Sequence, residues 1–198
     1  MTDARRIFLA GATGVIGIRL VPLLVAAGHT VAGMTRTPAK SDTLRALGAA
    51  PVIADAFDAE GLQAALDGFR PDTIVSQLTD LPDERALVVE RAAANARIRR
   101  EGTHNLIAAA RAAGVSRFLA QSVAWELDGD GGAAVADLEA AVLANDGVVL
   151  RYGQFYGFGT YHDSGPPPHP RVQIDDAARR TVPVLDAAPG VVWIVDPT

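Results

Sequence analysis

Seven short runs rich in apolar and β-branched residues alternate with alanine- and leucine-rich stretches of helical period along the chain. This alternation is typical of a parallel sheet covered by crossover helices. The near-continuous apolar character of the runs suits strands buried on both faces. We therefore predict an α/β fold, a Rossmann-like doubly wound parallel sheet of about seven strands with helices on both faces. The expected strands are 6–10, 30–35, 51–54, 73–77, 117–121, 148–152 and 191–195.

The stretches between these runs predict helices, and the longest of them carries a group of arginines. Residues 83–113 have the pattern of one long helix with acidic residues near its start. We interpret four arginines on it as a solvated face and not as a binding patch. They are Arg91, Arg97, Arg99 and Arg100.

Two segments interrupt the alternation, and one proline falls inside an expected helix. The run Asp-Gly-Asp-Gly-Gly at 128–132 is expected to be a flexible loop, and 164–170 cannot form a helix or a central strand because its prolines lack N–H donors. Residues 171–198 are too short to fold alone, so we expect them to return to the same core as a strand, a helix and a last strand. Pro183 in that helix predicts a kink or an early end.

Composition limits the partners and the compartment. The chain has 198 residues, which fits one domain, and a net charge of -5, which argues against nucleic-acid and anionic-membrane surfaces. A small molecule is the expected partner. The absence of cysteine fits a reducing compartment. No signal peptide or run of about 18 apolar residues is found, so we expect a soluble cytoplasmic protein.

One cluster has residues that could bind a metal ion. His162, Asp163 and His169 lie within eight residues of each other on a proline-rich stretch. Nothing in that stretch has the helical or strand geometry that would align them as ligands, so solvated loop residues are the better interpretation. We predict no metal site.

A glycine-rich turn follows the first expected strand and opens the first expected helix. In this context such a turn binds a dinucleotide: the first glycine allows a tight turn, the second lets a pyrophosphate approach, and the third lets helix and strand pack closely. The helix N-terminus offers unpaired N–H groups to the phosphates. The alternative is a turn without a ligand, which the strand–turn–helix context disfavours. The expected cofactor-binding residues are Gly11, Thr13, Gly14, Val15, Ile16 and Gly17.

The end of the second expected strand bears on the choice of nucleotide. An acid there would bind the adenosine ribose hydroxyls, whereas an arginine suits a 2′-phosphate. Arg36 ends this strand, and Lys40 follows one turn later. A surface arginine is the alternative. We predict NADP as the cofactor, with NAD as the second choice.

Several sequence blocks stand in a fixed order along the chain: GATGVIG, VAGMTRTPAK, ADAFD, EGTHNLIAAARAAGVSRFLAQSVAW, LRYGQFYGFGT and RVQIDDAARRTVPVL. Together they resemble one family, the extended short-chain dehydrogenases/reductases in their NAD-dependent epimerase/dehydratase branch. The match covers most of the chain, and the resemblance implies a single NAD(P)-binding Rossmann domain over 1–198, with 160–198 as a shortened C-terminal substrate region. Members of this family often dimerise through two long helices, so a homodimer is a hypothesis.

The resemblance also implies roles for individual residues. Asp55 and Ala56 match residues that contact the adenine, and Ser122 matches the catalytic serine or threonine that hydrogen-bonds the reacting oxygen. A hydroxyl that caps a strand end is the alternative for Ser122. The adenosine ribose and pyrophosphate are expected to pass Ser76, Gln77 and Leu78.

One departure from the family concerns its catalytic chemistry. Relatives carry a tyrosine and, four residues later, a lysine that lowers the pKa of the tyrosine for proton transfer. Gly131 and Val135 stand at these places, and no lysine follows Lys40. We hypothesise an NADP-dependent oxidoreductase or epimerase in which Tyr152 or Tyr156 replaces the missing proton donor toward a carbonyl or sugar-like substrate. A catalytically silent NADP-binding sensor or partner module is the alternative.

Overall fold

A computed structural model of the chain describes residues 4–198; residues 1–3 of the expected domain lie outside the described residues. All seven predicted strands are present, and they form one parallel sheet in the order β3-β2-β1-β4-β5-β6-β9. The predicted doubly wound α/β fold is therefore confirmed. The strands are β1 (Arg6–Ala10), β2 (Thr30–Thr35), β3 (Ala50–Ile53), β4 (Thr73–Ser76), β5 (Arg117–Val123), β6 (Val148–Tyr152) and β9 (Gly190–Ile194).

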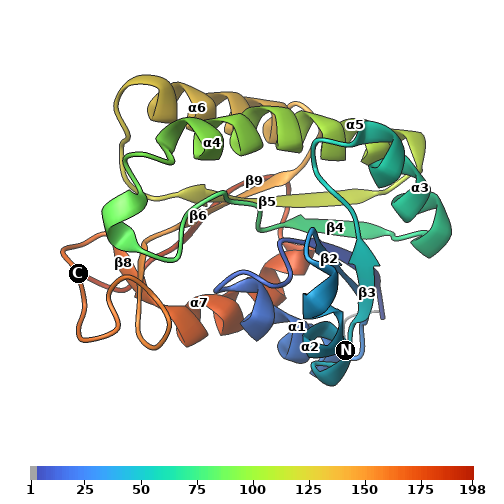
Figure 1. The fold of residues 1–198 in the computed structure, drawn as a ribbon, viewed down its shortest axis with the longest axis horizontal. Coiled ribbons are helices and arrows are strands. Elements are labelled where there is room, and N and C mark those ends of the chain that lie inside the picture. Colours follow the sequence, from blue (N-terminus) through green and yellow to red (C-terminus); the bar gives the residue numbers. More distant parts are fainter. Residues whose placement is uncertain (1–3) are drawn as a thin grey trace.

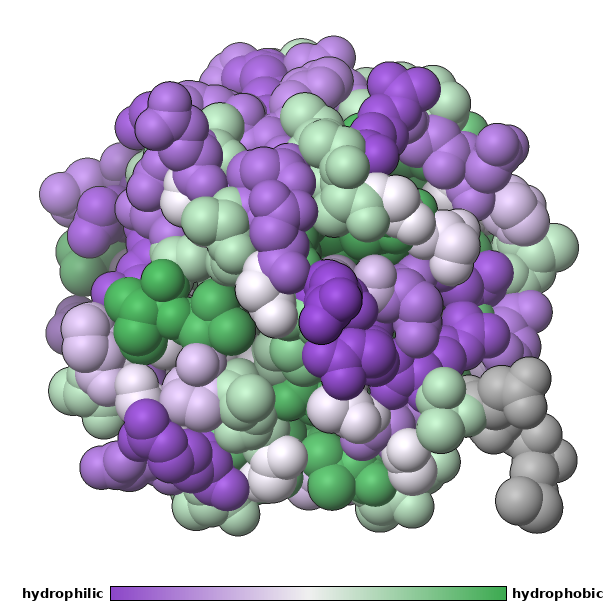
Figure 2. Space-filling model, turned by 90° about the vertical axis from the view of Figure 1, so that its right-hand side faces the viewer, coloured by the Kyte–Doolittle hydropathy of each residue, from purple (hydrophilic) through white to green (hydrophobic). Residues whose placement is uncertain are grey.

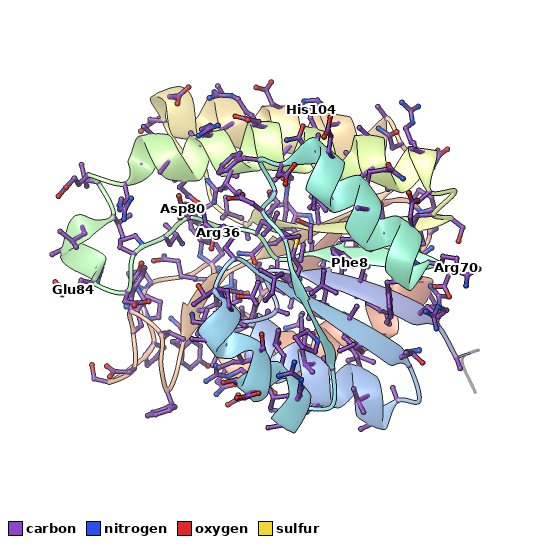
Figure 3. All side chains as sticks on the ribbon, turned by 45° about the vertical axis from the view of Figure 1, so that its right-hand side comes forward. Phe8, Arg36, Arg70, Asp80, Glu84 and His104 are labelled. Atoms are coloured by element: carbon purple, nitrogen blue, oxygen red, sulfur yellow. The ribbon has the colours of Figure 1, made fainter. Side chains whose placement is uncertain are left out.

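Helices cover both faces of the sheet (Figure 1). One face carries α1 (Gly17–Ala26), α2 (Ser41–Ala46) and α7 (Ile174–Thr181), and the other carries α3 (Ala59–Phe69), α4 (Ala92–Arg97), α5 (Thr103–Ala112) and α6 (Gly129–Leu143). Side chains alternate between two apolar cores: Ile7 and Leu9 of β1 pack on the α1 side, and Phe8 and Ala10 pack on the α5 side. Phe8 lies in the interior in Figure 3.

The register of the central strands brings their carboxyl ends to one edge of the sheet. Ala10 at the end of β1 lies opposite Met34 of β2 on one side and Ser76 of β4 on the other. The order of the strands reverses between β1 and β4, where open α/β sheets leave a crevice for ligands. The loops after these strands therefore share one crevice.

The predicted long helix over 83–113 is wrong at its start. This segment contains the 3-10 turn η2 (Arg85–Leu87), then α4, the π-helical turn η3 (Ile98–Gly102) and α5. Residues before α4 lie beyond the edge of the sheet, where Val89 remains 87% exposed. Because no second surface buries their apolar side chains, a helix gains little stability there.

The loop predicted over 128–132 is also wrong, because α6 begins at Gly129. Arg100 explains the difference: its guanidinium donates to Asp130 at 2.6 Å and to Asp137 at 2.9 Å. These contacts fix the first turn of α6 to η3, and the acidic Asp130 suits the positive end of the helix. Tertiary contacts thus override the weak helix propensity of the glycines.

The C-terminal residues return to the core as predicted. The strand β8 (Arg171–Gln173) pairs with β7 (Gln154–Tyr156) in a small second sheet, and α7 then leads toward β9, which joins β6. The α-helix ends at Thr181 and continues as the 3-10 turn η4 (Val182–Asp186), so the early end predicted from Pro183 is confirmed. The loop over 164–170 contains no helix or strand, as predicted.

The surface mixes polar and apolar groups. Figure 2 shows one face on which hydrophilic residues surround smaller hydrophobic areas. Within residues 4–198, every helix is too short or too polar to cross a membrane.

Candidate functional site

A cavity of about 990 Å³ lies at the carboxyl edge of the sheet. Its walls come from the glycine turn, the loops after β2, β4 and β5, the turn η3, and the loop over 159–162. Four cations and one acidic residue line it, although the chain as a whole carries a net charge of -5. The cavity is therefore suited to an anionic ligand. These charged residues are Arg36, Lys40, Asp83, Arg85 and Arg99.

The glycine turn presents its backbone to this cavity. Gly11 has φ +78°, and a Cβ atom there would lie 2.6 Å from the carbonyl oxygen of Gln77. Among the described residues, no hydrogen-bond acceptor is found for the N–H groups of Thr13, Val15 and Ile16. Three free amides at a helix N-terminus fit a diphosphate. The predicted turn residues thus place three free amides at this edge of the cavity.

Arg19 holds this turn in place, and sequence reasoning did not single it out. Its guanidinium donates to the carbonyl oxygens of Val15 at 2.7 Å and Phe158 at 2.6 Å, and to Asp175 at 2.7 Å. Since these acceptors come from the turn, a distant loop and α7, the residue connects three segments. The helical position of Arg19 gave no signal of these partners.

The predicted 2′-phosphate residues lie together at the end of β2, and both line the cavity. Arg36 forms an ion pair of 3.1 Å with Asp80 in the loop after β4, and the two labelled side chains lie next to each other in Figure 3. The side chain of Arg36 is 48% exposed, so it retains access to a ligand. Asn95 accepts a hydrogen bond of 3.1 Å from the N–H of Asp80 and so positions this loop. Lys40 is exposed nearby.

The residues expected beside the adenosine divide into two groups. Ala56, Gln77 and Leu78 line the cavity. Asp55 and Ser76 lie outside its lining: the Asp55 carboxylate accepts the N–H of Phe57 at 3.0 Å, and Ser76 is buried in β4. The side-chain oxygen of Gln77 is buried without a hydrogen-bond donor among the described residues, which leaves an acceptor for a ligand in this wall.

Ser122 lines the cavity, but its hydroxyl proton has a protein acceptor. The hydroxyl donates to Glu139 of α6 at 2.6 Å, and Arg151 of β6 donates to the same carboxylate at 2.8 Å. Burial raises the pKa of Glu139, but the hydrogen bonds from Arg151 and Ser122 outweigh it and hold the pKa below its ordinary value. Glu139 is therefore ionised at neutral pH and keeps the serine proton pointed away from a substrate oxygen.

Tyr152 is 1% exposed at the wall of the cavity. Thr181 donates its own proton to the carbonyl oxygen of Ala177, so the Tyr152 hydroxyl donates to Thr181 at 2.6 Å; Gln77 donates to Tyr152 at 3.2 Å. Burial raises the pKa of Tyr152 to about 12. These contacts are those of a structural hydroxyl.

The other two tyrosines lie in different surroundings. Tyr156 is outside the cavity lining, and its hydroxyl donates to Asp196 at 2.9 Å, which raises the pKa of Tyr156. Tyr161 lines the cavity, and its hydroxyl donates to the carbonyl oxygen of Pro82. Tyr161 was not predicted from the sequence, and its contact connects the loop over 159–162 to the loop after β4.

The interpretation of the four arginines as a solvated face is wrong for Arg99. Its exposed fraction is 7%, and it lines the cavity. Arg97 and Arg100, on either side of it, form exposed ion pairs with Glu101 and with Asp130 and Asp137. The π-helical turn accounts for the difference, because its hydrogen bonds join residues five apart and so shift the side chains relative to an α-helix.

The comparisons with known proteins agree with this geometry. Residues 11–144 match the sequence model of a family described as NAD(P)H-binding. A 3-diazoavenalumate denitrifying reductase from Streptomyces sp is 41% identical over 179 residues, which cover 78% of this chain and 58% of the relative. A 3-beta-hydroxysteroid dehydrogenase from Mycolicibacterium neoaurum is 31% identical over 120 residues, or 60% of this chain and 32% of the relative. The chain thus spans less than two thirds of either curated relative.

Solved structures show the same fold at low sequence identity. The UDP-glucose 4-epimerase of Thermus thermophilus, in complex with NAD, superposes with a TM-score of 0.80 at 20% identity, covering 98% of this chain and 78% of that one. A Bacillus halodurans protein described as an NAD-dependent epimerase/dehydratase superposes with a TM-score of 0.79 at 19% identity, covering 98% and 95%.

Proposed function

The chain belongs to the NAD(P)H-binding family, and on this premise we propose that it binds NADPH in the cavity and reduces a small-molecule substrate. The free amides of Thr13, Val15 and Ile16 hold the diphosphate. Arg36 and Lys40 bind the 2′-phosphate, which favours NADPH over NADH.

The hydrogen bonds that the tyrosine and serine hydroxyl groups donate support the rest of the proposal. The chain contains three tyrosines, and each donates its proton to a protein acceptor: Thr181, Asp196 or the carbonyl of Pro82. The proton of Ser122 is likewise directed to Glu139. In this arrangement no tyrosine acts as the general acid that the sequence hypothesis assigned to Tyr152 or Tyr156.

This arrangement favours a substrate that accepts hydride without receiving a proton from a tyrosine or from Ser122. A bound nicotinamide supplies the hydride. A carbonyl group that receives it becomes an alkoxide and needs a proton, whereas a cationic diazo or iminium group becomes neutral. Hydride addition at a terminal diazo nitrogen, followed by loss of dinitrogen, leaves the hydrogen on carbon. The name of the Streptomyces relative, which refers to a diazo compound, supports this class.

The remaining lining fits the substrate end of such a site. Trp125, Leu127 and Phe155 provide apolar and aromatic walls, and Tyr161 closes one side. We place residues 160–198 on the substrate side because 160–162 line the cavity. Aromatic walls of this kind bind a flat apolar substrate well.

A cofactor-binding protein without turnover is the second candidate. It is favoured by the same observation, that the tyrosine and Ser122 hydroxyls donate their protons to protein acceptors. One experiment separates the two. NADPH and NADH binding is measured by calorimetry, and NADPH oxidation is then followed with an arenediazonium salt, an aldehyde and a UDP-sugar.

We expect tighter binding of NADPH and oxidation with the diazonium salt above the rate without protein. Binding without oxidation of any substrate would favour the silent module. Absence of binding by either nucleotide at about 1 mM, which corresponds to about 4 kcal/mol, would contradict both.

A further inference from the structure

Arg99 is a buried cation that faces the cavity without a protein partner. Within residues 4–198, its guanidinium has no hydrogen-bond acceptor and no acidic group within ion-pair distance, and its exposed fraction is 7%. Burial lowers the pKa of Arg99, and no acidic neighbour opposes this effect. A guanidinium nevertheless remains protonated at neutral pH. The charge therefore lacks a counter-ion among the described residues.

Such an arrangement destabilises the free protein, because a buried charge is costly unless it is paired. The neighbouring arginines show that acidic partners are available to this segment, both within η3 and from α6. Arg97 pairs with Glu101 at 2.7 Å, and Arg100 pairs with Asp137 at 2.9 Å. Arg99 instead lines the cavity, where a ligand can supply negative charge.

Arg99 reaches the cavity from a different wall than the phosphate-binding residues. The glycine turn, Arg36 and Lys40 approach the cavity from the loops after β1 and β2. Arg99 comes from η3, on the other face of the sheet, and η3 packs against α6. Arg100 of η3 donates to Asp137 of α6 at 2.9 Å, and Glu139 of the same helix holds Ser122 at the end of β5. Trp125 and Leu127 follow β5 and form apolar walls of the cavity.

We propose that Arg99 forms a second anion subsite, which binds the carboxylate of an aromatic acid while the glycine turn and Arg36 bind the cofactor. The planar guanidinium presents a fork of donors that matches a carboxylate in a bidentate manner. The apolar side chains of β5 and its loop then cover the aromatic body of the acid. This inference rests on the proposed function, because it names the substrate class of the same site.

The test measures binding, so that it is independent of turnover. Cinnamate and cinnamamide are titrated by calorimetry into the full chain saturated with NADP⁺. They share shape and differ in charge. We expect cinnamate to bind about tenfold or more tightly than cinnamamide, as for a hydrogen bond to a charged group. R99M should remove this preference and R99K should keep part of it, whereas the exposed control R111M should leave it unchanged.

Two further readouts exclude other roles. R99M without ligands should melt at or above the temperature of the wild type, because the variant removes an unpaired buried charge; a clear decrease would show a structural role and overturn the proposal. R99M should also bind NADPH as the wild type does. A loss of NADPH affinity equal to that of R36M would assign Arg99 to a cofactor phosphate and overturn the substrate assignment.

Equal affinities for cinnamate and cinnamamide in the wild type would likewise overturn the proposal. Failure of NADPH oxidation with every substrate would contradict the proposed reduction, but the preference for the acid would still be measurable. The two proposals therefore fail separately.

Discussion

The two ends of the cavity are built in different ways. At the glycine turn, the groups proposed to bind the ligand are backbone amides, which a local run of seven residues places after β1. At the end of β5 and β6, the wall depends on contacts between side chains from distant segments, such as Ser122, Glu139 and Arg151. The first end follows from a local motif, whereas the second depends on which partners the fold brings together.

The largest expected effect on cofactor binding is at the glycine turn. G11A places a Cβ atom 2.6 Å from the carbonyl oxygen of Gln77 at φ +78°. We expect NADPH affinity to fall at least about 100-fold, which is about 2.7 kcal/mol, and the free energy of unfolding to fall by about 2 kcal/mol. Calorimetry and urea denaturation measure these changes.

A matched control is G68A in α3, where an added Cβ atom meets no neighbour within 4 Å. This variant should be stabilised by up to about 1 kcal/mol, since alanine favours a helix over glycine. Unchanged NADPH affinity in G11A would show that the turn does not bind the cofactor.

At the end of β5 and β6, E139Q removes the charge that binds both Ser122 and Arg151. We expect a loss of about 2 kcal/mol in the free energy of unfolding at neutral pH, because Arg151 loses its buried partner. The pKa of Glu139 is lowered in the folded protein, so its contribution is complete above the unfolded pKa and is lost as the pH falls through the folded pKa.

The difference between wild type and E139Q should therefore disappear in strongly acidic buffer. Urea denaturation at several pH values measures it. A difference that grows as the pH falls would contradict the assigned direction.

The preference for NADPH over NADH tests the role of Arg36. R36M removes a guanidinium that lines the cavity beside Asp80. We expect about tenfold weaker binding of NADPH and little change for NADH, because only NADPH carries the 2′-phosphate. Equal losses for both nucleotides in calorimetry would place Arg36 elsewhere along the cofactor.

The smallest expected effect concerns the tyrosine that the sequence suggested as a proton donor. Y152F removes the hydroxyl that donates to Thr181, so the free energy of unfolding should fall by about 1 kcal/mol. NADPH oxidation should stay within about threefold of the wild type, since general acid catalysis usually contributes at least about 100-fold. A loss of that larger size would restore Tyr152 as a catalytic residue.

The sheet could be predicted because its signals are local. Strands buried on both faces are continuous apolar runs, and β1 to β6 and β9 match these runs closely. The start of α6 could not be predicted, because Arg100 fixes it through contacts with Asp130 and Asp137, 30 and 37 residues away. A sequence window contains no information about such partners.

The candidate site divides in the same way. Gly11 and Arg36 line the cavity. Both could be predicted, because Gly11 belongs to a sequence motif and Arg36 follows the end of a strand. Arg99 was assigned to solvent because α-helical spacing does not anticipate a π-helical turn. The partner of Arg19 lies 156 residues along the chain, so its role in holding the turn had no local signal.

In the proposed function, the free amides of the glycine turn bind the diphosphate of the cofactor. Amide NMR spectra of isotope-labelled protein, recorded during titration with NADP⁺, test this binding directly. We expect the amide signals of Thr13, Val15 and Ile16 to shift strongly and to saturate together. Unchanged signals at these three residues, with shifts confined to another surface, would contradict it.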